Sequence, residues 1–271
     1  MISPADPSQL PPQSPPLAGE ASAREAETAV PPRRTMLLPD IDWVTIPGGT
    51  FIYQKGERRE LPAFRIARYP VTNIQYQCFT DAGGYGDERW WQGLRRPEPE
   101  PSRWSQGNRP RTNVHWYEAV AFCRWLSAQL GYQVRLPMED EWERAARGRD
   151  GRQYPWGGTY ESGWANINET WSGQQVGEWN LGQTTAVGVY PHAASSEGVL
   201  DLSGNAWEWC LNKYDRPGET HADTSGQARV LRGGSWNGTA DVARGTVRNR
   251  RGPGGRFSHY GFRLVSSAPI S

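Results

Sequence analysis

The chain has 271 residues, 36% of them hydrophobic, and a formal net charge of +1. This length allows one large domain or two small ones, and the near-neutral charge lacks the basic excess of nucleic-acid-binding domains, so we expect no nucleic-acid partner. No apolar run approaches the roughly 20 residues of a membrane-spanning helix, and the N-terminus lacks the basic and apolar regions of a secretory signal. We therefore expect a cytoplasmic protein without a membrane span.

The first part of the chain differs in composition from the rest. Residues 1–38 are rich in Pro, Ser, Ala and Glu. Such a segment cannot bury enough apolar surface to offset the entropy lost on ordering, so it is predicted to be a disordered tail or linker. A tail of this kind would tether the domain predicted for residues 39–268 to another module or assembly.

Short apolar stretches predict several strands in the domain. Alternating apolar residues at 43–46, 51–53 and 64–69 are typical of half-buried strands. Residues 201–210 and 230–236 are dense in Trp and Gly, which supply buried area and unusual turns. We interpret them as two strands joined by a long excursion.

Helical signals are fewer and well delimited. Thr72 is a plausible N-cap for a helix over 73–80, which Gly83 and Gly84 would end. Apolar residues at helical spacing predict further helices at 116–130, before Gly131, and at 139–147, before Gly148. Much of the remaining chain is aperiodic, so the predicted fold class is α+β, with short strands, two to three helices and long loops.

The three cysteines, Cys78, Cys123 and Cys210, lie far apart in apolar stretches. An odd and sparse set is neither a disulfide framework nor a zinc motif. We expect reduced cysteines buried in the fold.

A series of short motifs resembles the formylglycine-generating enzyme, or sulfatase-modifying factor, family. The motifs stand in family order at residues 46–51, 70–73, 114–119, 135–148, 154–157, 204–209, 232–236 and 261–263. The resemblance covers about residues 41–265 and implies the C-type lectin-like fold of that family. Met138 departs from the pattern, because the family usually has a capping Thr there, and this change would cost about 1 kcal/mol of helix stability.

The oxidase chemistry of that family depends on two cysteines spaced C-x4-C after the Gly-Gly-Ser-Trp motif, which bind copper(I). Aligned from Trp236, those two positions are Gly238 and Ala243 in this chain. Neither side chain can bind copper, so the resemblance implies a non-catalytic member, and we predict that the chain is not an enzyme of that kind.

Iron is not expected either. The iron-dependent sulfoxide synthases carry the same domain, and three histidines, largely from a separate helical domain, bind their iron. The four histidines here are scattered at His115, His192, His221 and His259. They are interpreted as ordinary surface or core residues.

The resemblance also implies a structural calcium ion. The first family site would use the side chains of Asp201 and Glu208 with the carbonyls of Gly204 and Ala206, a set of hard oxygen ligands. A second would use Asn166 and the Ile167 carbonyl, with a residue near Glu178 or Asn180. In the alternative interpretation, Asn205 and Glu208 only form hydrogen bonds to the backbone.

The segment 237–260 resembles the mutated stretch in the variable proteins of diversity-generating retroelements. In that group, mutation of template adenines turns Asn codons into codons for almost any residue, at the C-terminus of a C-type lectin fold. The residues that match non-catalytic relatives are Trp236, Arg244, Arg248, Asn249, Arg250, Pro253 and Arg256. Departures fall where the relatives often have Asn or another polar residue, and these are Gly238, Thr239, Val242, Gly245, Val247, Arg251, Gly252, Gly255, Phe257, Ser258, His259 and Tyr260.

These twelve departing positions are the predicted ligand-binding residues. Side chains that face solvent can change at little cost to stability, and aromatic residues and Arg dominate binding hot spots. The predicted function is the display of a diversified surface that binds a protein ligand through residues 238–260. Two alternatives are a static, non-catalytic binding or scaffold domain of the family and a metal-dependent oxidase of that family. A further alternative for Phe257 and Tyr260 is packing in the core.

Overall fold

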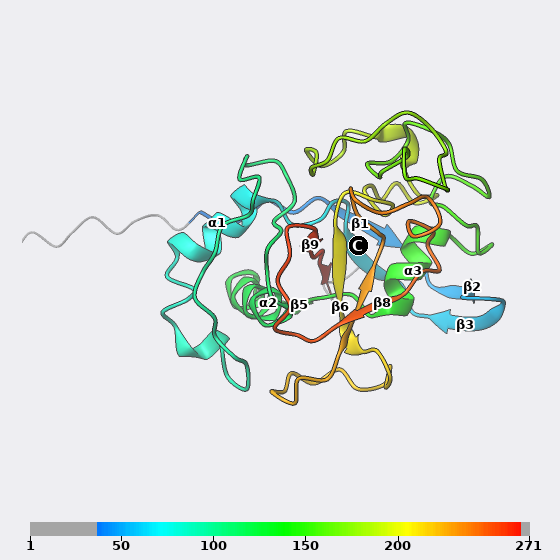
Figure 1. The fold of residues 1–271 in the computed structure, drawn as a ribbon. Helices are drawn as coiled ribbons and strands as arrows, with labels where there is room; N and C mark the ends of the chain where they lie inside the picture. Colours follow the sequence, from blue (N-terminus) through cyan, green and yellow to red (C-terminus); the bar gives the residue numbers. More distant parts are fainter. Residues whose placement is uncertain (1–36, 267–271) are drawn as a thin grey trace, which may run out of the picture. The chain divides into compact units, whose positions relative to one another are not determined.

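The computed structural model describes residues 37–266 (Figure 1), so nearly all of the tail predicted for residues 1–38 lies outside the described residues. Among the described residues, three α-helices and ten short strands are joined by long connections. The α+β class predicted from the sequence is therefore confirmed. No helix in residues 37–266 has the length and apolar character needed to cross a membrane.

The first sheet combines strands from both ends of the domain. Its strands are β1 (Trp43–Ile46), β4 (Phe64–Ala67), β10 (Val265–Ser266) and β5 (Val134–Arg135), in that order. Val265 of β10 pairs with Ile66 on one side and with Arg135 on the other. The last described strand thus lies between strands from the first half of the chain.

A two-stranded hairpin follows β1. It consists of β2 (Gly49–Tyr53) and β3 (Glu57–Leu61), which pair antiparallel. The sequence did not predict β3, because Glu57-Arg-Arg-Glu60 has no apolar alternation. Its backbone pairing with β2, rather than burial of its side chains, makes it a strand.

The second large sheet supports the C-terminal part of the domain. It has the order β8 (Asn249–Arg251), β7 (Arg229–Arg232), β6 (Trp207–Lys213) and β9 (Tyr260–Gly261). Strands β6 and β7 pair antiparallel, and they are the two strands predicted in the Trp- and Gly-rich segments, although β6 begins at Trp207 and not at residue 201. Strand β9 runs parallel to β6 and forms one edge of the sheet.

All three predicted helices are present with nearly the predicted bounds. They are α1 (Asn73–Asp81), α2 (Trp116–Leu130) and α3 (Glu139–Arg147). The Thr72 hydroxyl accepts from the Gln75 N–H and caps α1, while Gly131 ends α2 in the left-handed conformation. At Met138 no side-chain oxygen caps α3, and the Met138 N–H instead donates to the Glu141 carboxylate at 2.8 Å.

Helix α2 is the centre of the main hydrophobic core. Its Trp116, Phe122 and Trp125 are buried, and the Phe122 ring lies 5.5 Å from the rings of Tyr76 and Phe262. A second buried cluster forms around Trp142 of α3. The cysteines are free, with Cys123 and Cys210 buried as predicted and Cys78 only half-buried.

Candidate ligand-binding surface

The segment 237–260 leaves β7, crosses the second sheet and returns as β9 (Figure 1, orange to red). It begins at a sharp reversal, because Gly234 has φ of +74° and a Cβ there would lie 3.1 Å from the Ala243 Cα. Only glycine adopts this conformation without strain. The Gly-Gly-Ser-Trp motif therefore turns the chain back over the preceding part of the domain, residues 41–235, which together with residues 261–266 we call the platform.

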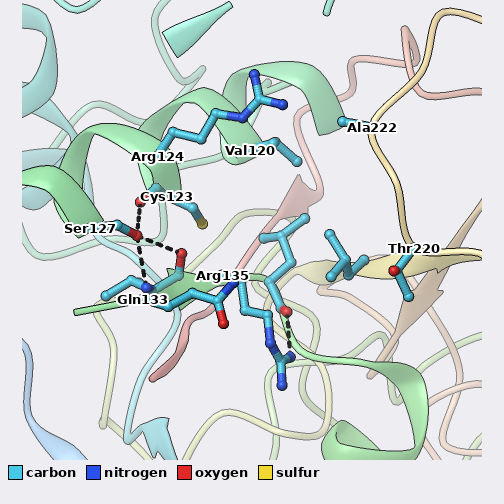
Figure 2. Close-up of a pocket in the computed structure, with 11 residues that line it drawn as sticks. Val120, Cys123, Arg124, Ser127, Gln133, Arg135, Thr220 and Ala222 are labelled. Atoms are coloured by element: carbon cyan, nitrogen blue, oxygen red, sulfur yellow. Dashed lines mark hydrogen bonds between the residues drawn. The ribbon is translucent and has the colours of Figure 1, made fainter. Parts of the chain in front are cut away.

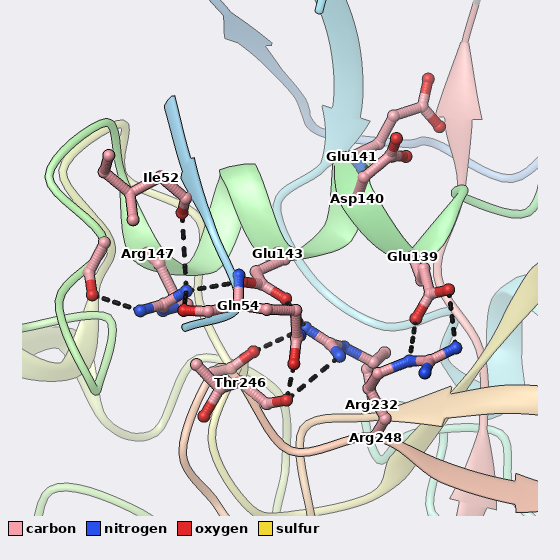
Figure 3. Close-up of polar contacts among 12 residues, drawn as sticks. Ile52, Gln54, Glu139, Asp140, Glu141, Glu143, Arg147, Arg232, Thr246 and Arg248 are labelled. Atoms are coloured by element: carbon pink, nitrogen blue, oxygen red, sulfur yellow. Dashed lines mark hydrogen bonds and ion pairs between the residues drawn. The ribbon is translucent and has the colours of Figure 1, made fainter. Parts of the chain in front are cut away.

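A buried polar network holds the backbone of this segment (Figure 3). The Arg232 guanidinium donates to the Glu143 carboxylate at 2.5 Å and to the Gly245 carbonyl at 2.7 Å. The Gln54 amide, from the turn between β2 and β3, donates to the Thr246 carbonyl at 3.1 Å. Arg232 and Glu143 are 0% exposed, and a buried charge is tolerated only when it is paired. The network thus fixes residues 245–246 to both α3 and the hairpin.

Arg248 is a second attachment point (Figure 3). Its guanidinium donates to the two oxygens of Glu139, at 2.5 and 2.9 Å, and to the Tyr214 carbonyl at 3.0 Å. It also lies 4.3 Å from the centre of the Tyr214 ring. Two parallel bonds to one carboxylate give a strong and directional pair. Arg248 therefore joins the segment to the first turn of α3.

Arg256 makes the corresponding attachment to α2. It pairs with the buried Glu118 at 2.8 Å and with Glu100 at 2.6 Å, and it donates to the Glu98 carbonyl. Glu118 is the third residue of α2 and is 0% exposed. Arg248 and Arg256 therefore attach the segment to carboxylates in the first turns of two helices, partners that no local pattern in the sequence indicated.

Along the segment, most of the predicted ligand-binding residues reach the surface. Arg251 is exposed, and eight others are partly exposed, namely Gly238, Val242, Val247, Gly252, Gly255, Phe257, Ser258 and His259. Val242, Val247 and Phe257 also pack against the edge of the core. These side chains therefore have one face on the domain and one face toward solvent.

Three of the twelve predicted positions do not face solvent. Thr239, Gly245 and Tyr260 are buried. Tyr260 belongs to β9, is 6% exposed and lies 5.6 Å from the Trp209 ring. The expectation that they lie on a solvent-facing surface was wrong, because the returning strand buries Tyr260 and the network around Arg232 encloses Gly245. For Tyr260 the alternative of core packing is confirmed.

An aromatic group forms the central part of this surface. Trp236 lies 5.3 Å from Trp104 and 6.5 Å from His259, and the Phe257 ring lies 5.6 Å from His259. Trp104 comes from the long loop before α2, and no local pattern in the sequence indicated this contact. Burial, followed by the positive charge of Arg251, lowers the pKa of His259 to about 4, so its imidazole is neutral at pH 7.

A groove away from this surface lies between α2 and β5 (Figure 2). It has a volume of about 410 Å³. Its lining is mainly apolar and comprises Val120, Cys123, Arg124, Ser127, Gln133, Val134, Arg135, Leu136, Leu211, Thr220 and Ala222. No residue of 237–260 belongs to this lining.

The residues predicted to hold calcium come close together at their backbones. Asn166 and Gly204 form a bridge, and the Asn205 N–H donates to the Asn166 carbonyl at 2.8 Å. The Asn166 Oδ1 is buried and receives no hydrogen bond from residues 37–266. Burial raises the pKa of Asp201 to about 6. An unpartnered oxygen and a desolvated carboxylate are both suited to a hard cation.

Glu208 fits the predicted calcium site less well. Arg263 donates to both of its oxygens, at 2.5 and 2.7 Å, and the Trp142 indole donates at 2.7 Å. The alternative interpretation was that Glu208 forms hydrogen bonds and binds no metal. Its contacts agree with that interpretation, although its partners are side chains and not the backbone. Across residues 37–266, no group of three or more His, Cys, Asp or Glu side chains is placed to hold a metal ion.

The two positions that correspond to the copper-binding cysteines lie inside the segment. Gly238 is partly exposed, whereas Ala243 is buried in a small apolar cluster with Ala240 and Ile167. A methyl group and a hydrogen atom offer no ligand at either place. Gly238 therefore forms part of a turn, and Ala243 makes a packing contact.

Comparison with known proteins agrees with the motifs. The profile of the sulfatase-modifying factor enzyme 1-like domain matches residues 27–268. The chain belongs to this family. Family members that resemble it include the inactive C-alpha-formylglycine-generating enzyme 2 of Mus musculus, which is 30% identical over 83% of this chain and 85% of that protein.

Other members of the sulfatase-modifying factor enzyme 1-like family are named as enzymes. The hercynine oxygenase of Mycolicibacterium thermoresistibile is 34% identical, over 76% of this chain and 51% of that protein. The chain thus spans about half the length of this curated relative. The family therefore includes both a protein named as inactive and proteins named as oxygenases.

Solved structures show the fold. Treponema denticola variable protein 1 has a TM-score of 0.62 at 24% identity and covers 83% of this chain and 94% of its own. CarF has a TM-score of 0.63 at 26% identity and covers 86% of this chain and 99% of its own. The chain has the C-type lectin-like fold of the formylglycine-generating enzyme type, as the sequence motifs implied.

Proposed function

We propose that this chain is a binding protein that displays residues 238–260 as a ligand-contacting surface, diversified between clones by a retroelement, and that its ligand is a protein. The observation that carries this proposal is the alternation within one segment. Arg248 and Arg256 are tied to buried carboxylates, while Val247, Arg251 and Phe257 beside them reach solvent. Such a segment keeps its backbone while its contact side chains change.

The likeness to Treponema denticola variable protein 1 supports the fold on which this proposal depends. The residues that reach solvent include Arg251 and Phe257, and Arg and aromatic residues are enriched at protein interfaces. They form an open surface rather than an enclosed cavity, and this favours a macromolecular ligand over a small molecule.

The direct test is deep sequencing of the coding DNA for residues 230–266 and its downstream flank in a natural population. We expect the codons of Val247, Arg251 and Phe257 to vary while those of Arg248 and Arg256 stay fixed. A near-copy of the sequence with AAC at the varying codons is expected nearby. An invariant segment without a near-copy would leave the second candidate, a static binding or scaffold domain with one specific partner.

We propose that recognition, and not turnover, is the activity of this domain. The reason is the side-chain chemistry at Gly238 and Ala243, where copper-binding cysteines are absent. Because some relatives are named hercynine oxygenases, a metal-dependent oxidase is the competing candidate. Conversion of a Cys-x-Pro-x-Arg peptide by the purified protein, or iron or copper retained in stoichiometric amount, would overturn our proposal.

Structural calcium is a further part of the proposal: a first site would use Asp201 and Glu208 with the carbonyls of Gly204 and Ala206, and a second would use Asn166 and the Ile167 carbonyl. The buried Asp201 carboxylate supports the first site, and the unpartnered Oδ1 of Asn166 supports the second. Calcium added after chelation is expected to raise the melting temperature. The absence of a shift would remove the claim. The cytoplasmic location and the tethering role of residues 1–38 stay predictions.

A further inference from the structure

A small groove opens at the edge of the proposed binding surface. It has a volume of about 250 Å³ and lies between the start of α2 and the turn after β8. Its lining consists of Arg95, Tyr117, Gly226, Arg251 and residues 252–255. The Gly255 N–H donates to the Gly252 carbonyl at 2.8 Å, and a Cβ at Gly254 would meet no atom within 4 Å. The glycine turn therefore leaves the groove open.

The two arginines of this groove are unlike those that fix the segment. Arg95 and Arg251 are both exposed, and neither forms an ion pair with an Asp or Glu among residues 37–266. The Arg251 guanidinium lies 4.7 Å from the centre of the Phe257 ring, which orients it. Two unpaired positive charges thus line one opening.

Asp223, whose charge acts on the Tyr117 phenol, is paired with other groups. Asp223 is bound by Lys213 at 2.9 Å and by the Ser225 hydroxyl at 2.6 Å. Tyr117, which also lines the groove, contributes a phenol, a group that can donate a hydrogen bond to an anion. The groove therefore combines positive charge, a hydroxyl group and an adjacent aromatic ring.

We infer that this groove accepts a carboxylate side chain, Asp or Glu, from an acidic segment of the protein ligand, with an apolar neighbour packed on Phe257. This inference rests on the proposed function and names the chemistry of the ligand that this particular sequence would bind. Guanidinium groups bind carboxylates in a planar, two-bonded geometry, which selects a carboxylate by shape as well as charge. Arg95 and Arg251 supply the charge, and Phe257 supplies the apolar contact.

The test is selection of a phage library of random peptides on the purified full-length chain, followed by binding measurements with the selected peptides as synthetic probes. We expect selected peptides to be enriched in Asp or Glu next to an apolar residue. Arg251→Gln and Arg95→Gln should each weaken binding about fivefold, because each exposed ion pair contributes up to about 1 kcal/mol. Arg58→Gln on β3 is the matched control, since it removes the same charge from an exposed site and should change the affinity less than about twofold.

The failure of this inference can be told apart from failure of the proposed function. Selected peptides that are neutral or basic, an absence of binders, or equal affinities of Arg251→Gln and Arg58→Gln would overturn the groove assignment. If such peptides still lose binding with Phe257→Asn, the segment is a binding surface with a different specificity. If binding is unchanged by Phe257→Asn, Val247→Asn and Arg251→Gln together, the proposed function itself is wrong.

Discussion

Arg263 and Arg251 show how differently two regions of this domain use the same residue type. Arg263 is 0% exposed and pairs with Glu208 at 2.5 Å, while it also donates to the carbonyls of Ala67 and Leu200. Arg251 is exposed and has no carboxylate partner in the described part of the chain. The platform beneath the segment uses its charges to fix the fold, whereas the surface leaves charges free for a ligand. Sequence change should therefore be costly in the first region and tolerated in the second.

The largest effect is expected from breaking the platform. Arg263→Met leaves the buried Glu208 with the Trp142 indole as its one side-chain donor among residues 37–266, so we expect a loss of about 3–5 kcal/mol in the free energy of unfolding. Urea denaturation followed by tryptophan fluorescence would measure it. Arg251→Met is the control, and its change should stay within about 0.5 kcal/mol. Similar losses for the two variants would break the distinction between the regions.

An intermediate effect is expected at the attachment points. Arg248→Met removes both hydrogen bonds to the buried Glu139, which keeps the Asn212 amide as a donor, so we expect a loss of about 2 kcal/mol. Amide hydrogen exchange should also become faster in residues 245–251, because the loop backbone is released. Arg250→Met, at the neighbouring exposed position, should do neither. Unchanged exchange in Arg248→Met would show that the salt bridge does not hold the loop.

The pH dependence of stability tests whether His259 is buried against the domain or belongs to the free surface. Its pKa is lowered from 6.5 to about 4 in the folded chain, so between these values the unfolded chain binds more protons. Stability is therefore lost as pH falls from 6.5 toward 4, by about 1–2 kcal/mol once solvent screening of this partly exposed group is considered. His259→Asn should remove this part of the pH dependence in denaturation curves. An equal slope in the wild type and the variant would contradict the assigned burial of the imidazole.

The smallest effect on stability, with a clear effect on binding, is expected at the contact residues. Ser258→Asn and Val247→Asn should change the free energy of unfolding by less than about 1 kcal/mol, because both side chains are partly exposed. Ligand affinity should change about tenfold or more if these side chains lie in a contact centre. Calorimetry with a selected partner measures the affinity. Stable variants that bind with wild-type affinity would place the contact elsewhere.

The sequence predicted the helices well because their signals are local. The Thr72 cap, Gly131 and Gly148 mark where the chain must start or stop a helix. Strands β3, β5, β8, β9 and β10 were missed because they are short and their partners, not their own patterns, define them. The first sheet also requires β10 to pair with β4 and β5, which lie far earlier in the chain.

The candidate site was predictable in outline only. Arg248 and Arg256 stood out because they match relatives, but their partners Glu139 and Glu118 belong to distant helices and could not be predicted. Nothing local distinguishes the buried Tyr260 from the half-exposed Phe257, since both are aromatic residues in one short stretch. Arg95 and Tyr117 entered the surface only through the fold, because they approach residues 251–255 from the loop before α2 and from α2 itself.

The most direct test of the central claim is a library in which Val242, Val247, Arg251, Phe257, Ser258 and His259 are randomised together. Our account predicts that most clones stay folded, with melting temperatures within a few degrees of the parent, and that selection on unrelated proteins yields different binders. A matched library at Arg232, Glu143, Arg248 and Arg256 should contain few folded clones. If the first library unfolds as often as the second, or never yields a binder, residues 238–260 are not a tolerant binding surface on a fixed platform.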